Sequence, residues 1–125
     1  MSHMVQILDI MEKALNGKPM SETDYQLKVF APKVQEKVRE HGIKFDRENP
    51  IPQDNSMADE VFEAGLELLL DVGAFCTSSG RTIRFTEQEV RESLRRAPSK
   101  LYFGEGRDKK ALVARSVGDK TPPWC

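Results

Sequence analysis

The stretch that decides the fold is DNSMADEVFEAGLELLLDVGAFCTSSGRTIRFT, residues 54–86. Its first part carries apolar side chains at helical spacing, in numbers that predict burial on almost every side. The apolar positions are Met57, Val61, Gly65, Leu68, Leu69 and Val72, with Phe62, Leu66 and Leu70 beside them. Asp54 or Asn55 can cap the first turn, and Gly73 can close the last one. We therefore predict a core helix that ends at Val72.

The second part of this stretch predicts a β-hairpin. Phe75, Ile83 and Phe85 flank a Ser-Ser-Gly turn, and this pattern is typical of two short paired strands. Residue chemistry alone gives the helix and hairpin the role of a scaffold.

Two helices are predicted before this core. Residues 5–16 carry apolar side chains on one face, and Gly17 followed by Pro19 ends that helix. A second helix begins at Ser21 and ends at Gly42. Pro32 lies inside it and predicts a kink or two abutting helices. Residues 44–53 contain two prolines without a regular period, and they predict an irregular connection.

A helix and two strands are predicted after the core. Thr86 and Glu89 form a capping box, Pro98 stops the helix, and Val90, Leu94 and Ala97 form its expected buried stripe. Residues 100–104 and 111–117 have the composition of strands that pair across a turn. The predicted fold class is an α+β segment with about four helices and a small antiparallel sheet. We expect one domain over residues 5–120, a tag remnant at 1–4 and a truncated tail at 121–125.

Length and composition exclude several classes of protein. A chain of 125 residues holds one modest core, but a complete eight-fold α/β barrel needs roughly 250 residues. No apolar run approaches the ~20 residues of a membrane span, and no signal sequence opens the chain. Two cysteines do not make a disulfide framework, so we expect a cytoplasmic protein without a membrane partner.

The charge of the chain is unevenly distributed. Residues 81–125 hold 11 basic and 6 acidic side chains, whereas residues 1–80 hold 8 basic and 14 acidic ones. No aromatic platform, zinc spacing or reading motif accompanies the basic residues, which include Arg84, Arg91, Arg95, Arg96 and Arg107. We therefore favour a solvated or interdomain surface over binding of nucleic acid.

The residue types that carry chemistry are sparse and scattered. His3 lies in the tag remnant, which leaves His41, and neither Cys76 nor Cys125 has a neighbouring ligand at metal-site spacing. Cys76 is interpreted as a small packing residue. Glu63 and Glu67 lie one helical turn apart, as an acid/base pair would, but two glutamates on the polar side of a helix more often form a solvated face.

The glycine-rich stretch GEGRD, residues 104–108, suggests a phosphate-binding loop. It lacks the further glycine and following helix of a dinucleotide site, and also the Lys-Ser/Thr of a P-loop. A turn between two strands is the favoured interpretation. Arg107 and Asp108 can form an exposed ion pair there, which would contribute roughly 0–1 kcal/mol.

With FEAGLELLLDVGAFCTSSGRTIRFTEQEV at residues 62–90, the sequence resembles the N-terminal region of methylamine methyltransferases. The most similar family is the monomethylamine:corrinoid-protein methyltransferases, and the trimethylamine methyltransferases are more distant. The shared residues are 62–65, Gly73, 76–77, 85–87, 103–104, 106–108 and 115–120. The similarity covers residues 54–120 and is thinner over 21–53. None of these motifs is catalytic by itself.

The resemblance implies transfer of a methyl group from monomethylamine to the cobalt of a separate corrinoid protein, in methanogenesis or methylotrophy. The complete subunit of this family is a (β/α)8 TIM barrel and is expected to form a homo-oligomer. In many members an amber-encoded pyrrolysine orients the amine, and it lies downstream of this region. No catalytic, cofactor-binding or metal-binding residue is therefore assigned to this chain. We expect it to be an inactive fragment that packs on the barrel; the alternative is a free-standing α+β interaction or regulatory module.

Overall fold

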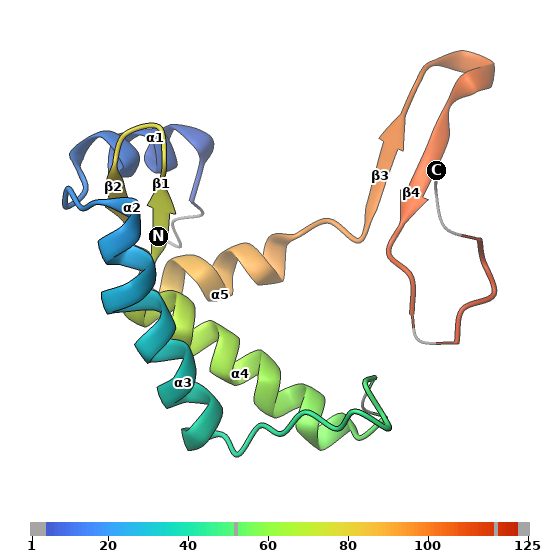
Figure 1. Ribbon diagram of the computed structural model, residues 1–125. Coiled ribbons are helices and arrows are strands. Elements are labelled where there is room, and N and C mark those ends of the chain that lie inside the picture. The colour runs from blue at the N-terminus through green and yellow to red at the C-terminus, as the bar shows by residue number, and fades with distance from the viewer. Residues whose placement is uncertain (1–4, 52, 117, 123–125) are drawn as a thin grey trace.

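The computed structural model describes residues 5–51, 53–116 and 118–122, and its elements follow the predicted order (Figure 1). The predicted tag remnant, Cys125 and most of the predicted tail lie outside the described residues. The helices and strands are α1 (Ile7–Asn16), α2 (Glu22–Asp24), a π-helical stretch (Tyr25–Phe30), α3 (Ala31–Glu40), α4 (Asn55–Val72), β1 (Ala74–Cys76), β2 (Arg81–Ile83), α5 (Glu87–Arg96), β3 (Lys100–Phe103), a 3-10 turn (Gly106–Asp108) and β4 (Lys110–Val113).

The predicted antiparallel pairing is confirmed, but the strands form two separate two-stranded sheets. In the first sheet Phe75 faces Thr82, and Pro19 adds an isolated bridge to Arg81 on the far side of β2. In the second sheet Leu101 faces Leu112. Figure 1 shows β1 and β2 beside α1, whereas the β3–β4 hairpin stands away from the helices, beyond α5.

The predicted interruption at Pro32 takes the form of abutting helical segments. Proline has no backbone N–H, so it suits the first turn of a helix and not its interior. Here Pro32 lies in the first turn of α3, directly after the π-helical stretch, where the Ala31 amide donates to the Gln26 carbonyl. The wider π turn therefore lets the chain run on from α2 to α3 as one helical rod (Figure 1).

The predicted helix ends are confirmed by their hydrogen bonds. The side chain of Asp54 accepts from the Ser56 amide, and Thr86 and Glu89 form a complete capping box. Gly42 has a φ of +59°, and the Ile43 amide donates to the Val38 carbonyl, which is a Schellman motif.

The predicted burial is wrong in two helices. In α4 only Ala64, Leu66 and Val72 are buried, and Phe62 keeps 52% of its surface exposed. In α5 the side chain of Leu94 is 49% exposed, and the residue that is buried is Glu92, whose carboxylate pairs with Arg95 and Arg96 one turn further along α5. We expected α4 to be buried on almost every side and α5 to bury an apolar stripe. Neither is observed, because no other element of the described residues covers those faces.

The core is correspondingly small. Its apolar members are Tyr25, Ala64, Leu66, Val72 and Ile83, drawn from the π-helical stretch, α4 and β2. The Tyr25 hydroxyl donates to the Gly73 carbonyl at 3.0 Å, and the Tyr25 ring stacks on Phe75 with the centroids 5.2 Å apart. This cluster holds the helical rod against the junction between α4 and β1. No helix in the described ranges combines the length and apolar character needed to span a membrane.

Candidate functional site

Helices α3 and α4 are joined by charged side chains that we call the α3–α4 ion cluster: Lys37, His41, Glu60, Glu67 and Asp71. Lys37 Nζ lies 2.9 Å from Glu67 Oε2 and 3.4 Å from Asp71 Oδ2. Both imidazole nitrogens of His41 face carboxylates, Nδ1 at 2.7 Å from Glu60 and Nε2 at 3.2 Å from Glu67. The side chains of Lys37 and His41 are only 13% and 15% exposed, so water screens these pairs less than it screens ordinary surface pairs.

These contacts shift the protonation equilibria of the cluster. The carboxylates of Glu60 and Glu67 raise the pKa of His41 above its ordinary value, and Lys37, followed by His41, lowers the pKa of Glu67. An imidazole donates from both nitrogens only when it carries both protons. The cluster therefore favours the imidazolium form of His41. That form fastens two helices and leaves no free nitrogen that could act as a general base.

Glu63 and Glu67 do not form a pair. Glu67 lies in the ion cluster, whereas Glu63 is directed to Arg91 of α5, whose Nη2 is 3.6 Å from Glu63 Oε2. Both side chains stay about half exposed, 48% for Glu63 and 44% for Glu67, as a solvated face would be, but Glu67 is also held by ion pairs across the helices. Its partners Lys37 and His41 lie on another helix, 30 and 26 residues away, and no local pattern could have indicated them.

A second junction joins α1 to α5. Lys13 Nζ lies 2.7 and 2.8 Å from the two carboxylate oxygens of Glu89, and it also donates to the Arg84 carbonyl at 3.1 Å. Burial by itself would raise the pKa of Glu89, but Lys13 and the Thr86 amide outweigh it and hold the pKa below its ordinary value. The same glutamate thus caps α5 and anchors α1.

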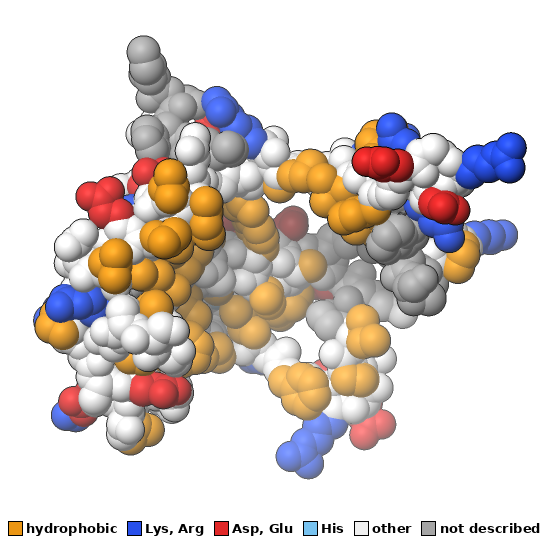
Figure 2. Space-filling model, turned by 90° about the horizontal axis from the view of Figure 1, so that it is seen from above, with side chains coloured by type: hydrophobic (Ala, Val, Ile, Leu, Met, Phe, Trp, Pro, Cys, Tyr) orange, Lys and Arg blue, Asp and Glu red, His pale blue; other side chains and the backbone are white. Residues whose placement is uncertain are grey.

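An apolar groove of about 400 Å³ opens beside this junction. It is lined mainly by Val5, Ile10, Leu69, Phe85, Val90 and Leu94. Phe85 and Val90 both line this groove. Outside the groove, α1 exposes Ile7, Leu8, Met11 and Leu15, each by more than half of its surface. Figure 2 shows hydrophobic side chains gathered over the face seen from above. These surfaces are suited to packing against protein.

Cys76 lies half-buried in β1, close to the turn before β2. The hydroxyl of Ser79, followed by the amides of Ser79 and Ser78, lowers the pKa of its thiol. No histidine of the described residues is paired with Cys76; His41 is held by glutamates on α4. The interpretation of Cys76 as a packing residue remains the simplest one, and Cys125 lies outside the described residues.

The GEGRD stretch is a turn, as predicted, and it joins β3 to β4. Gly104 and Gly106 have positive φ angles, and a Cβ at Gly104 would lie 2.6 Å from the Asp108 carbonyl oxygen. The predicted pair between Arg107 and Asp108 is absent from the ion pairs within the described ranges.

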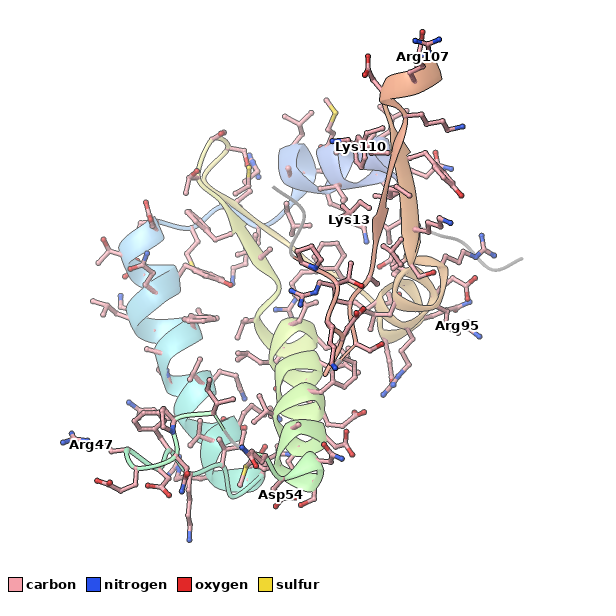
Figure 3. The ribbon with its side chains drawn as sticks, turned by 90° about the vertical axis from the view of Figure 1, so that its right-hand side faces the viewer. Lys13, Arg47, Asp54, Arg95, Arg107 and Lys110 are labelled. Carbon is pink, nitrogen blue, oxygen red and sulfur yellow. The ribbon has the colours of Figure 1, made fainter. Side chains whose placement is uncertain are left out.

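The arginines do not share one basic surface. Figure 3 places Arg107 at the tip of the hairpin and Arg95 on α5. Arg91 contacts Glu87 and Glu63, and Arg95 and Arg96 both contact Glu92. Arg84 donates to the Asp71 carbonyl. Four of the five arginines that were considered as possible nucleic-acid ligands thus bind acidic side chains or backbone carbonyls of this chain. Among the described residues, no group of three or more His, Cys, Asp or Glu side chains is arranged to hold a metal ion.

The family model for monomethylamine methyltransferase MtmB matches residues 5–125. The chain is 33% identical over 115 residues to monomethylamine methyltransferase MtmB2 of Methanosarcina barkeri, and 32% identical over the same length to MtmB of Methanosarcina mazei. Each alignment covers 92% of this chain and 25% of the relative, so the chain spans about a quarter of the length of the curated relatives it matches.

Solved structures give the same result. The crystal structure of the Methanosarcina barkeri monomethylamine methyltransferase matches with a TM-score of 0.82 and 32% identity, over 93% of this chain and 25% of that one. A structure described as its hydroxylamine complex matches equally well. The helices and two small sheets described above are therefore shared with a quarter of a larger, solved protein.

Proposed function

Because the chain belongs to the monomethylamine methyltransferase MtmB family, we propose that it is the N-terminal part of a subunit that transfers a methyl group from monomethylamine to a corrinoid protein. The observation that carries this proposal is the match of residues 5–125 to the family model, together with coverage of only a quarter of each relative. The subunit would be completed by a (β/α)8 barrel, as the family resemblance implies. We expect it to be cytoplasmic and to assemble with copies of itself.

We propose further that this segment contributes structure and no catalytic group. Within the part of the chain that the structure describes, the one histidine that contacts carboxylates, His41, is engaged in contacts between α3 and α4. The amine, the corrinoid and the residues that act on them would be handled by the rest of the subunit. The segment would supply apolar faces on α1, α4 and α5 against which that part packs.

The exposed apolar side chains support this role. A protein of this size that worked alone would bury the large apolar side chains of its central helix, whereas Val61 and Phe62 of α4 are 46% and 52% exposed. A free-standing interaction module, the second candidate, would use only one such surface for its partner. Here exposed apolar side chains lie on α1, the π-helical stretch, α3, the connection before α4, α4, α5 and the β3–β4 hairpin.

The experiment that tests the proposal is a methyl-transfer assay with monomethylamine and a reduced corrinoid protein of the family, followed by the absorbance change of the corrinoid. We expect activity from the longer subunit encoded by the gene and none from the 125-residue chain. Activity of the 125-residue chain alone would contradict a structural role. An inactive longer subunit, tested with several methylamines, would contradict the methyltransferase assignment.

A further inference from the structure

The apolar groove beside the α1–α5 junction has walls from several parts of the chain. Ile10 contributes from α1, Leu69 from α4, Phe85 from the connection after β2, and Leu94 from α5. Its volume of about 400 Å³ is far larger than the roughly 30 Å³ share of one water molecule, so it can admit side chains of another part of the protein. Leu94 is 49% exposed although it lines the groove, so the groove is open.

The walls of the groove are held in place by Lys13. Its Nζ lies 2.7 and 2.8 Å from the two carboxylate oxygens of Glu89, and 5.3 Å from the centroid of the Phe85 ring. One ammonium group on α1 therefore fixes a residue of α5 and the aromatic residue that precedes that helix. An occupant of the groove does not have to order these walls, and a preorganised site is bound at a lower entropic cost.

The polar side chains of the groove already have partners within the chain. Of the eight residues that line it, only Glu89 and Ser93 have polar side chains. The Glu89 carboxylate accepts from Lys13 and from the Thr86 amide, and Ser93 Oγ donates to the Glu89 carbonyl oxygen at 2.7 Å. Covering a polar group is costly mainly when the group is left without a hydrogen bond. The lining of the groove therefore favours an occupant with apolar side chains.

The comparison with the solved relative indicates where this occupant comes from. The match covers 93% of this chain with a TM-score of 0.82, but only 25% of the relative, so three quarters of the relative lie outside it. In Figure 1 α5 lies between α1 and the β3–β4 hairpin, and the chain continues beyond that hairpin. Covalently joined parts can meet at an effective concentration on the order of millimolar, well above that of a second copy in dilute solution. The rest of the same subunit is therefore the favoured occupant.

We propose that the groove receives apolar side chains from the part of the subunit that follows this segment, and that the groove side of α5 alone faces that part. This inference rests on the proposed function and names the contact that it requires. Leu94 would be buried there. Gln88 is exposed and does not line the groove, and it lies about 200° around α5 from Val90, so it would stay in solvent.

Thiol labelling on the two sides of α5 tests which side is covered. Leu94→Cys places a thiol in the groove and Gln88→Cys places one on the opposite side, in a background where Cys76→Ser and Cys125→Ser remove the native thiols of this segment. Each variant is made in the 125-residue chain and in the longer subunit encoded by the gene, and the reaction of the introduced thiol with N-ethylmaleimide is followed by peptide mass spectrometry. Ser93→Cys is a second, smaller change in the groove in case Leu94→Cys disturbs folding.

We expect the two thiols to react at rates within about threefold of each other in the dilute 125-residue chain, because Leu94 is half exposed there. In the longer subunit the Leu94→Cys thiol should react at least ~10-fold more slowly, while the Gln88→Cys rate changes less than about twofold. Equal reactivity of both thiols in a folded longer subunit, or protection of Gln88→Cys as well, would overturn the inference and leave the proposed function intact. A gene without the rest of the family's sequence would instead contradict the proposed function.

Photo-cross-linking identifies the occupant. The longer subunit with Leu94→photo-leucine is made in isotopically light and heavy forms, which are refolded together before illumination. We expect the cross-linked peptide to come from beyond residue 125 and to carry the same isotope label as the Leu94 peptide, because both belong to one subunit. A pair of peptides with different labels would show that a second copy fills the groove, and a cross-link to residues 1–125 would show that the segment covers itself. Either result would overturn the inference.

Discussion

Gly73 shows how one residue determines the link between the central helix and the first sheet. Its φ of +66° is a conformation that L side chains rarely adopt, and a Cβ there would lie 2.2 Å from the Ile83 carbonyl oxygen. We expect Gly73→Ala to lower the free energy of unfolding by about 1–3 kcal/mol or more, because both backbone strain and a steric clash are introduced. Urea unfolding followed by circular dichroism measures this.

The matched control for this substitution is Gly65→Ala on the same helix. A Cβ at Gly65 meets no atom within 4 Å, so the variant should gain about 0.5–1 kcal/mol from helix propensity. Equal effects of the two substitutions would show that the junction between α4 and β1 is not constrained as described.

Single residues also show which features the sequence could predict. Asp54, Thr86 and Gly42 were assigned correctly because a cap depends on residues within a few positions of it. The sequence also predicts correctly that Gly17 ends α1, but the physical reason why a glycine is needed there could not be predicted. Its φ is an ordinary −65°, and it is required because a Cβ would lie 2.0 Å from the carbonyl oxygen of Thr82, which is 65 positions away in the sequence.

At the level of elements, the α3–α4 ion cluster should make stability depend on pH. His41 lies between the carboxylates of Glu60 and Glu67, and Glu67 also pairs with Lys37. The two carboxylates raise the pKa of the His41 imidazole above its ordinary value of 6.5. A raised pKa in the folded state means that the stabilisation is fully present below pH about 6.5 and is lost as the pH rises through the folded-state pKa.

We therefore expect the free energy of unfolding to fall as the pH is raised through this range, and His41→Gln to remove that part of the dependence. Urea unfolding at a series of pH values measures it, and the imidazole NMR signal of His41 gives the pKa directly. A pKa at or below 6.5 for His41 in the folded chain would contradict the geometry of the cluster.

The junction between α1 and α5 allows a second experiment on how the elements are held together. Lys13 and Glu89 have side chains that are 29% and 18% exposed, and they bind each other through both carboxylate oxygens. A double-mutant cycle with Lys13→Met and Glu89→Gln should give a coupling energy of about 1 kcal/mol. The exposed pair of Lys28 and Asp24 serves as the control, with an expected coupling of about 0.5 kcal/mol or less. A coupling near zero for Lys13 and Glu89 would mean that this ion pair does not help to hold α1 on α5.

The elements were predictable where their signals are local. The central helix, the Ser-Ser-Gly hairpin and the capping box of α5 depend on side chains near to one another in sequence. The burial of α4 and α5 was not predictable in the same way. An apolar periodicity predicts that a face will be covered, but it does not indicate by what, and the described residues leave Phe62 and Leu94 largely uncovered.

The whole molecule exposes more apolar surface than a self-contained domain. Sixteen large apolar side chains of the described residues are exposed, and none of the described side chains is completely buried. We expect the purified chain to self-associate as its concentration rises, because contiguous apolar surface is covered by whatever protein is available. Sedimentation velocity measures this, and Leu8→Glu with Met11→Glu on α1 should weaken it. A chain that stays monomeric at all concentrations would contradict this expectation.

At this scale the sequence predicted the family and could not predict a catalytic site. The resemblance over residues 54–120 agrees with the match to the family model. The ion cluster was missed because its members come from two helices that are distant in sequence. The assignment of no catalytic residue, the single domain over 5–120 and the corrinoid partner stay predictions.

We have proposed that this chain is the N-terminal part of a longer methyltransferase subunit, and that the catalytic groups belong to the rest of that subunit. The most direct measurement is the nucleotide sequence of the gene beyond codon 125. We expect the reading frame to continue for about three times the length of this chain, a factor that follows from the 25% coverage of the relatives, and to encode the rest of the family's sequence. A stop codon directly after Cys125, with no methyltransferase sequence following it, would contradict the claim.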